Sequence, residues 1–183
     1  MVWLGGDGRS LNLYMDLLRS LPNGTGMAFV LAPNRIQRHL RPEVLSVVSE
    51  MPVVEVEDGM KLEADCVFIA SPGRRLSINN GVFRLRKCVP PPEWPKAVNA
   101  LLYSMVQDLG DRLVAVILSG LNADSSVALQ IVKDAGGVTL AQSVESHDGM
   151  PAPPVESGPV DHLLPPVELG KALVALGSGP REG

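Results

Sequence analysis

The sequence contains few aromatic residues, few cysteines and no long hydrophobic run. Phe, Trp and Tyr make up 4% of the 183 residues, which argues against a stacking surface for single-stranded nucleic acid. The two cysteines, Cys66 and Cys88, lack metal-knuckle spacing, so we expect reduced thiols, no disulfide and a cytoplasmic location. No apolar run approaches the ~20 residues that cross a bilayer, and no basic, apolar leader opens the chain. We therefore predict no membrane insertion.

Positive charge is also sparse in the sequence. The net charge is −4, and the longest basic cluster is RLRK at 84–87. This balance does not favour a nucleic-acid surface. An apolar content of 45% is enough for one full core. The composition therefore predicts a globular domain whose partner is a protein or a small molecule.

Short apolar runs alternate with amphipathic stretches along the chain. This order is typical of βαβ units around a mostly parallel sheet. Two short runs within 76–86 flank Asn79, Asn80 and Gly81, a pattern that predicts a β-hairpin. The run RLVAVILSG at 112–120 is the most apolar and is predicted to be the central strand. We therefore predict an α/β domain over 1–176 with a mostly parallel, doubly wound sheet, followed by a disordered tail over 177–183.

Candidate polar residues follow three of the predicted strands. Asp7 comes after the first strand, Asn34 after the second, and Asn122 and Asp124 after the most apolar one. Ligands of doubly wound sheets bind beyond the carboxyl ends of the strands, so we expect these residues to converge on one cleft. The segment GGDGRS at 5–10 lacks the glycine spacing of a dinucleotide loop, and no Walker lysine is present. We therefore predict no cofactor.

Six segments, in order, resemble the catalytic domain of the CheB family, the chemotaxis protein-glutamate methylesterases that hydrolyse methyl esters on chemoreceptor glutamates. The resemblance implies a three-layer Rossmann-like domain with one hairpin, and a chemoreceptor or other signalling protein as partner. The receiver domain that usually precedes this domain is missing, so we interpret the chain as an excised domain or as a member without one. The segments are VWLGGDGRSL (2–11), SPGRRL (71–76), VILSGLNADS (116–125), DAGGVTLAQ (134–142), GMP (149–151) and GPVDHLLP (158–165).

The resemblance breaks down at the family's Ser-His-Asp triad. Position by position, the nucleophilic serine falls on Asp7, and the general-base histidine falls on Pro33 or its neighbour Asn34. The orienting aspartate falls on Asp124, the one triad residue that is retained. The family's histidine after the Pro-Gly turn corresponds to Arg75.

Loss of the base has a larger chemical consequence than loss of the serine. A carboxylate can itself attack carbon, so Asp7 alone does not abolish catalysis. A proline at the base position neither accepts nor donates a proton, and general-base assistance is worth about 10²- to 10⁴-fold. We therefore predict a pseudoenzyme that binds a receptor or signalling partner.

Two alternative functions stay open at this point. One is an active methylesterase, a carboxylic ester hydrolase, in which Asp7 works with a base from another segment such as His147. The other is a small-ligand or cation-binding module in the same cleft, in which Asp7, Asn122 and Asp124 hold Mg²⁺ through oxygen ligands. Helix capping by the two aspartates is favoured over the metal, so no metal site is assigned.

The remaining candidates are positively charged residues, histidines and one loop. Arg74 and Arg75 could neutralise Asp7 or Asp124, and His39 and His162 are interpreted as surface histidines. The loop GMP matches a loop that the resemblance places over the cleft. The residues predicted to line the cleft or contact a partner are Asn34, Arg75, Asn122, His147, Gly149 and Met150.

Overall fold

The computed structural model describes residues 1–6, 11–33, 40–70, 74–87, 94–118, 123–143 and 159–178, with the backbone alone at 33, 94–99 and 123–125. Within these residues, seven parallel strands form one sheet, and two antiparallel strands form a separate hairpin. This is the predicted α/β fold. In spatial order the strands are β3 (Val53–Glu55), β4 (Val67–Ile69), β2 (Phe29–Pro33), β1 (Val2–Gly6), β7 (Val114–Ile117), β8 (Val138–Gln142) and β9 (His162–Leu164), and the hairpin is β5 (Arg74–Asn79) with β6 (Val82–Lys87).

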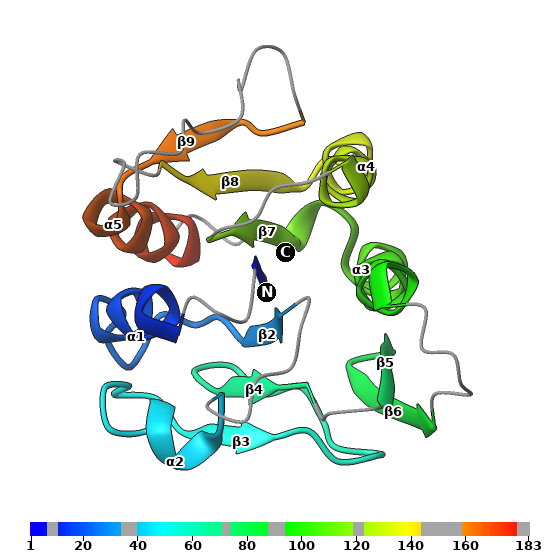
Figure 1. The fold of residues 1–183 in the computed structure, drawn as a ribbon, viewed down its shortest axis with the longest axis horizontal. Helices are drawn as coiled ribbons and strands as arrows, with labels where there is room; N and C mark the ends of the chain where they lie inside the picture. The colour runs from blue at the N-terminus through cyan, green and yellow to red at the C-terminus, as the bar shows by residue number, and fades with distance from the viewer. Residues whose placement is uncertain are drawn as a thin grey trace.

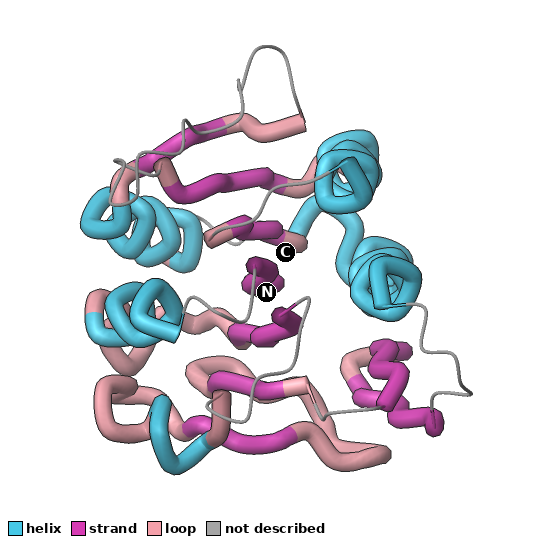
Figure 2. Tube along the Cα trace, viewed as in Figure 1, coloured by secondary structure: helices cyan, strands magenta, loops and turns pink. Residues whose placement is uncertain are grey.

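Helices cover both faces of the sheet, which makes three layers (Figure 1). On one face α1 packs against α5, with α2 beside them, and on the other α3 packs against α4 and the hairpin (Figures 1 and 2). None of the helices in the described ranges is long and apolar enough to cross a membrane. The helices are α1 (Leu11–Arg19), α2 (Pro42–Leu45), α3 (Trp94–Leu109), the 3₁₀ turn η1 (Gly110–Arg112), α4 (Ala123–Asp134) and α5 (Pro166–Gly177).

The inner strands β1, β4 and β7 contain no polar side chain because each face of the sheet is covered. Val2 and Leu4 of β1 join the core under α1 and α5. Trp3, between them in sequence, joins the core under α3, α4 and the hairpin. The alternation of side chains along a strand therefore divides the buried residues between two cores.

Three elements differ from the sequence predictions. The middle strand of the sheet is β1, and the more apolar β7 lies beside it. The segment RPEVLSVVSEM at 41–51, whose apolar spacing predicts a helix, forms only the short α2, which starts at Pro42. The strand β9 was not predicted, because it has three residues at the edge of the sheet and Leu163 is 41% exposed, so it carries no buried apolar run.

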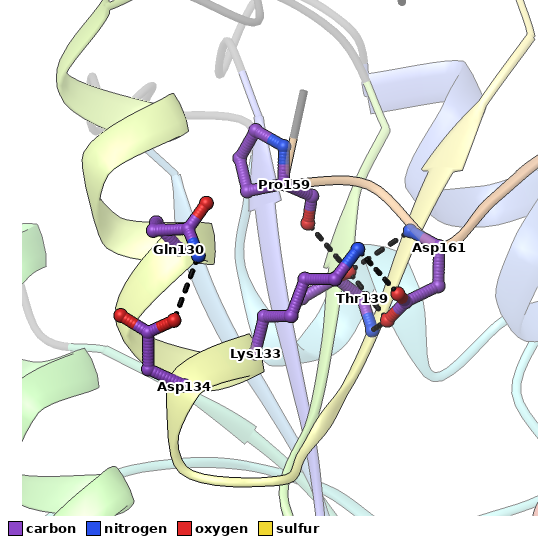
Figure 3. A network of polar contacts seen from close by, with 6 residues as sticks. All are labelled: Gln130, Lys133, Asp134, Thr139, Pro159 and Asp161. Carbon is purple, nitrogen blue, oxygen red and sulfur yellow. Dashed lines mark hydrogen bonds and ion pairs between the residues drawn. The ribbon is translucent and has the colours of Figure 1, made fainter. Parts of the chain in front are cut away.

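A polar network fastens the chain entering β9 to β8 and α4 (Figure 3). The Thr139 N–H donates to Asp161 Oδ2 at 2.9 Å, and Lys133 Nζ lies 2.8 Å from Asp161 Oδ1. The Asp161 N–H in turn donates to the Thr139 carbonyl at 2.9 Å. Partial burial raises the pKa of Asp161, but these hydrogen bonds and the Lys133 charge outweigh it and lower the pKa to about 2.

We predict that Asp161→Asn lowers the free energy of unfolding by about 1–2 kcal/mol at pH 7, after allowance for solvent screening. A lowered pKa stabilises the fold fully above the ordinary value of 3.8 and loses this effect as the pH falls toward 2. The difference in the free energy of unfolding between wild type and variant, measured by urea denaturation, should therefore become smaller between pH 4 and pH 2. Asp134→Asn, which removes the charge of an exposed carboxylate that accepts a hydrogen bond from Gln130 (Figure 3), is the matched control. An equal deficit at pH 7 and pH 2.5 would contradict the prediction.

Candidate functional site

The carboxyl ends of β2, β1 and β7 lie side by side and are nearly level. Gly6 at the end of β1 pairs with Pro33 at the end of β2, and Gly5 pairs with Ile117 of β7. The Leu118 N–H extends the ladder by donating to the Gly5 carbonyl at 3.0 Å. Neighbouring strands are about 4.8 Å apart. The chain therefore leaves the sheet at three adjacent points.

These three points flank the place where the strand order reverses. The crossover that follows β1 contains α1, on the α5 face, whereas the crossover that follows β7 contains α4, on the opposite face (Figure 1). Doubly wound sheets bind their ligands at such a switch point. The helix α4 begins at Ala123, so the backbone of Asp124 lies in its first turn and not in the N-cap position before it.

The indole of Trp3 lies beneath this edge of the sheet, on the α3–α4 face. Trp3 is 2% exposed, and a Cβ added to Gly5 would lie 2.1 Å from its Cη2 atom. The neighbouring strand positions are small, with Ala115 opposite Trp3 and Ala32 opposite Gly5. The ring therefore extends along β1 toward the carboxyl edge. The sequence signal for this contact is a tryptophan two residues before a glycine on a buried strand.

The indole Nε1–H of Trp3 is buried and has no hydrogen-bond partner in the described part of the chain. Such a group costs about 1–3 kcal/mol when it is left without a partner. Burial of the large ring against small neighbours offsets this cost. Among the described residues, Trp3 therefore makes packing contacts and no polar contact.

Most of the predicted site side chains lie outside the described residues, and their roles stay predictions. Pro33 and Asp124 are described by backbone alone, at the end of β2 and in the first turn of α4. The backbone thus brings the segments that carry both positions to the switch point. The predicted residues outside the described ranges are Asp7, Asn34, Asn122, His147, Gly149 and Met150.

Arg75 is described and lies apart from the parallel sheet. It is exposed on β5 and pairs directly with Arg86 of β6. Among the described residues, the ion pairs join Asp16 to Arg19 and Lys133 to Asp161. Neutralisation of Asp7 or Asp124 by Arg75 stays a prediction.

Two other side chains with reactive groups, His162 and Cys66, are not candidates for the site. His162 is exposed on β9, three strands from β1 or about 14 Å, which agrees with its interpretation as a surface histidine. Cys66 is a free, buried thiol, and burial, followed by the Glu63 charge, raises its pKa. A thiol that stays protonated is a poor nucleophile. Within the described ranges, no three His, Cys, Asp or Glu side chains are grouped to hold a metal ion.

A doubly wound parallel sheet with its candidate residues beyond β1, β2 and β7 defines a Rossmann-like α/β domain with a switch-point site. The chain belongs to the CheB methylesterase family, whose model matches residues 6–173. It is 37% identical over 131 residues to "Protein-glutamate methylesterase/protein-glutamine glutaminase 2" of Anaeromyxobacter dehalogenans, covering 70% of this chain and 38% of that protein. It is 33% identical over 138 residues to "Protein-glutamate methylesterase/protein-glutamine glutaminase 1" of Myxococcus xanthus, covering 72% of this chain and 40% of that protein.

A solved structure shows the same fold. The CheB methylesterase catalytic domain of Thermotoga maritima superposes with a TM-score of 0.82 at 26% identity, covering 96% of this chain and 97% of that one. The alignments span about two fifths of the length of the two curated relatives. The structural match therefore covers a catalytic domain, and the sequence matches cover part of longer proteins.

We predict that Gly5→Ala destabilises the fold by about 1–3 kcal/mol, because the added methyl group overlaps the Trp3 ring. In a Trp3→Leu background, where the ring is removed, the same substitution should cost at least about 1 kcal/mol less. Urea denaturation of the wild type, both single variants and the double variant measures this coupling. Additive effects, within about 0.5 kcal/mol, would show that the overlap is not the cause.

Proposed function

We propose that this chain is a CheB-like domain of a chemotaxis or related signalling system that acts by binding and does not hydrolyse esters. On this proposal its partner is a chemoreceptor or another signalling protein, and it works in the cytoplasm. The observation that carries the proposal is the pairing of Gly6 with Pro33. This pairing supports the assignment of Pro33 to the family's general-base position, next to Asp7, so that a proline stands there in place of a histidine.

The chemistry of ester cleavage explains why this position matters. If Asp7 attacked the ester carbonyl, it would displace methoxide and form an anhydride, which water must then open. Both steps need a group that takes and gives protons within hydrogen-bond reach. Proline has no such group. Asp124, at the position that orients the base in the family, would then have no base to orient.

The names of the curated relatives describe two activities, protein-glutamate methylesterase and protein-glutamine glutaminase. The first hydrolyses an ester and the second an amide at the same side-chain carbonyl. Departure of either leaving group requires proton transfer. Loss of the base therefore removes both activities on this proposal. Packing of the sheet, by contrast, depends on buried side chains such as Trp3 and Leu4.

We predict that the protein releases no methanol from a glutamate methyl ester peptide, and no ammonia from the matching glutamine peptide, above the rate of Asp7→Ala. Gas chromatography for methanol and a coupled assay for ammonia measure these rates. The reason is the missing proton acceptor, which is worth about 10²- to 10⁴-fold. Turnover that Asp7→Ala removes would establish the alternative of a working hydrolase, and His147→Ala would then test its base.

We also predict that Asp7→Ser combined with Pro33→His raises ester hydrolysis at least about 10²-fold above the wild type, because it restores the nucleophile and base beside the retained Asp124. Each single substitution should give less than a tenth of this gain, since the two groups act as a unit. Urea denaturation checks that all three variants are folded. A folded double variant without activity would show that more than the two reagents has been lost.

A further inference from the structure

The β5–β6 hairpin gathers positive charge that lies in two separate sequence segments. Arg74 pairs with Lys87, and Arg75 pairs with Arg86. Arg84 lies opposite Ser77 on the same ribbon. All these cationic side chains are exposed, and 74–87 contains no acidic residue. Together, over the two faces of the hairpin, they are here named the basic ribbon: Arg74, Arg75, Arg84, Arg86 and Lys87.

Three of the arginines share the outer face of the hairpin. Leu76 and Phe83 are 4% and 0% exposed and belong to the core under α3 and α4. Successive side chains on a strand point to opposite faces. Arg75, Arg84 and Arg86 alternate with these core positions and therefore face away from the core. Their substitution leaves the buried face of the hairpin unchanged.

The helix α3 holds the hairpin in place along one edge. The Asp108 carboxylate accepts the backbone N–H of Asn80 at 2.5 Å and of Gly81 at 2.9 Å. One turn earlier, the Ser104 Oγ accepts the Ile78 N–H at 3.0 Å. Both turn residues have positive φ angles, 51° at Asn80 and 68° at Gly81, as the tight Asn-Gly hairpin turn requires. The ribbon is thus a fixed surface and not a loose loop.

The other edge of the hairpin is also occupied. The Phe83 N–H donates to the Met60 carbonyl at 2.8 Å, and the Leu85 N–H donates to Asp58 Oδ1 at 2.8 Å. A partner strand therefore cannot add to these backbone groups of β6. Recognition at the hairpin falls to the side chains of its outer face.

The basic end of the hairpin lies at the carboxyl edge of the parallel sheet. The tip is fixed by Asp108 in the last turn of α3, which leads through η1 to the start of β7 at the opposite edge. The base, at Arg74 and Lys87, follows β4, which ends at Ile69. Five residues of chain span at most about 18 Å. The base of the hairpin therefore lies within about 18 Å of the carboxyl end of β4, which is parallel to β2 and β1.

The ribbon carries unbalanced positive charge in an acidic protein. It holds five of the 16 lysines and arginines, so the rest of the chain, with the other 11 and all 20 acidic residues, has a net charge of −9. Arg75 and Arg86 are directly opposite each other, an arrangement that destabilises a strand pair. No carboxylate in the described part of the chain forms an ion pair with the ribbon. As far as the described residues go, this charge has no carboxylate partner and can bind an external anion.

We propose that the basic ribbon docks a short acidic segment of a protein partner, held through its glutamate or aspartate carboxylates. This inference rests on the proposed function, in which the domain acts by binding. Arginine binds carboxylates with two parallel hydrogen bonds, and a six-residue strand offers a surface about 20 Å long. The net charge of −9 elsewhere disfavours a long nucleic acid or an anionic membrane, which would also meet the acidic surface.

Fluorescence anisotropy with fluorescein-labelled hexaglutamate tests the proposal on the whole chain. We expect saturable binding that weakens between about 0.05 and 0.5 M NaCl, and no binding of labelled hexaglutamine. The variant Arg75→Glu/Arg84→Glu/Arg86→Glu should raise Kd at least about 10-fold. The control variant Arg41→Glu/Arg112→Glu/Lys171→Glu makes the same change in net charge at exposed residues outside the hairpin, and it should stay within about 2-fold.

A single substitution separates docking from a structural role. Arg75→Glu places opposite charges across the pair with Arg86, so it should raise the urea midpoint of unfolding while it weakens hexaglutamate binding. A lowered midpoint together with weakened binding would mean that Arg75 supports the fold, and this result would overturn its role in docking.

Other binding results would also overturn the docking role of the basic ribbon. Absence of hexaglutamate binding, or equal loss in the two triple variants, is one such result. Tighter binding to an oligothymidylate of equal charge, or to phosphatidylcholine vesicles with about 30% phosphatidylserine, overturns it in favour of those partners. Ester turnover by the wild type would reject the proposed function. The hexaglutamate measurements would then still test whether the basic ribbon binds an acidic segment.

Discussion

The backbone ladder that joins β2, β1 and β7 is the constraint on which the rest of the molecule depends. Because Gly6 pairs with Pro33 and Leu118 bonds to Gly5, three strands end at one level. The chain after β1 crosses to one face of the sheet, and the chain after β7 crosses to the other. The helices α1 and α4 therefore pack on opposite faces, on either side of the switch point. The ladder thus determines both where a ligand approaches and where Trp3 is packed beneath it.

In several places an aspartate carboxylate joins two segments that are distant in the sequence by accepting a backbone N–H. Asp161 joins the chain before β9 to β8, and Asp108 joins the hairpin turn to α3. Asp65 does the same for Gly26, accepting its N–H at 2.8 Å across 39 residues. Each acceptor satisfies a donor that would otherwise be left at the end of an element. Acidic residues are therefore part of the framework and not only of the surface charge.

The residues that stabilise this fold and the positions predicted for catalysis lie in different parts of the molecule. The two cores lie on the faces of the sheet and are built from residues such as Leu4, Trp3 and Leu129. The positions predicted for the family's triad follow β1, end β2 and lie in the first turn of α4. A member of the CheB methylesterase family can therefore keep the fold of a catalytic domain, with a TM-score of 0.82 to one, while on the proposed function its triad positions hold Asp7 and Pro33.

By itself the sequence determined the fold class and the hairpin, since period-two runs and an Asn-Gly turn are local signals. It also predicted which residue types stand at the triad positions. Tertiary structure alone decided the central place of β1 and the pairing of the three-residue β9. It also decided the contact of Trp3 with Gly5 and the cross-strand pair of Arg75 with Arg86. These features depend on pairing between segments far apart in the chain, and hydrophobic periodicity within a short window holds no information about which segments pair.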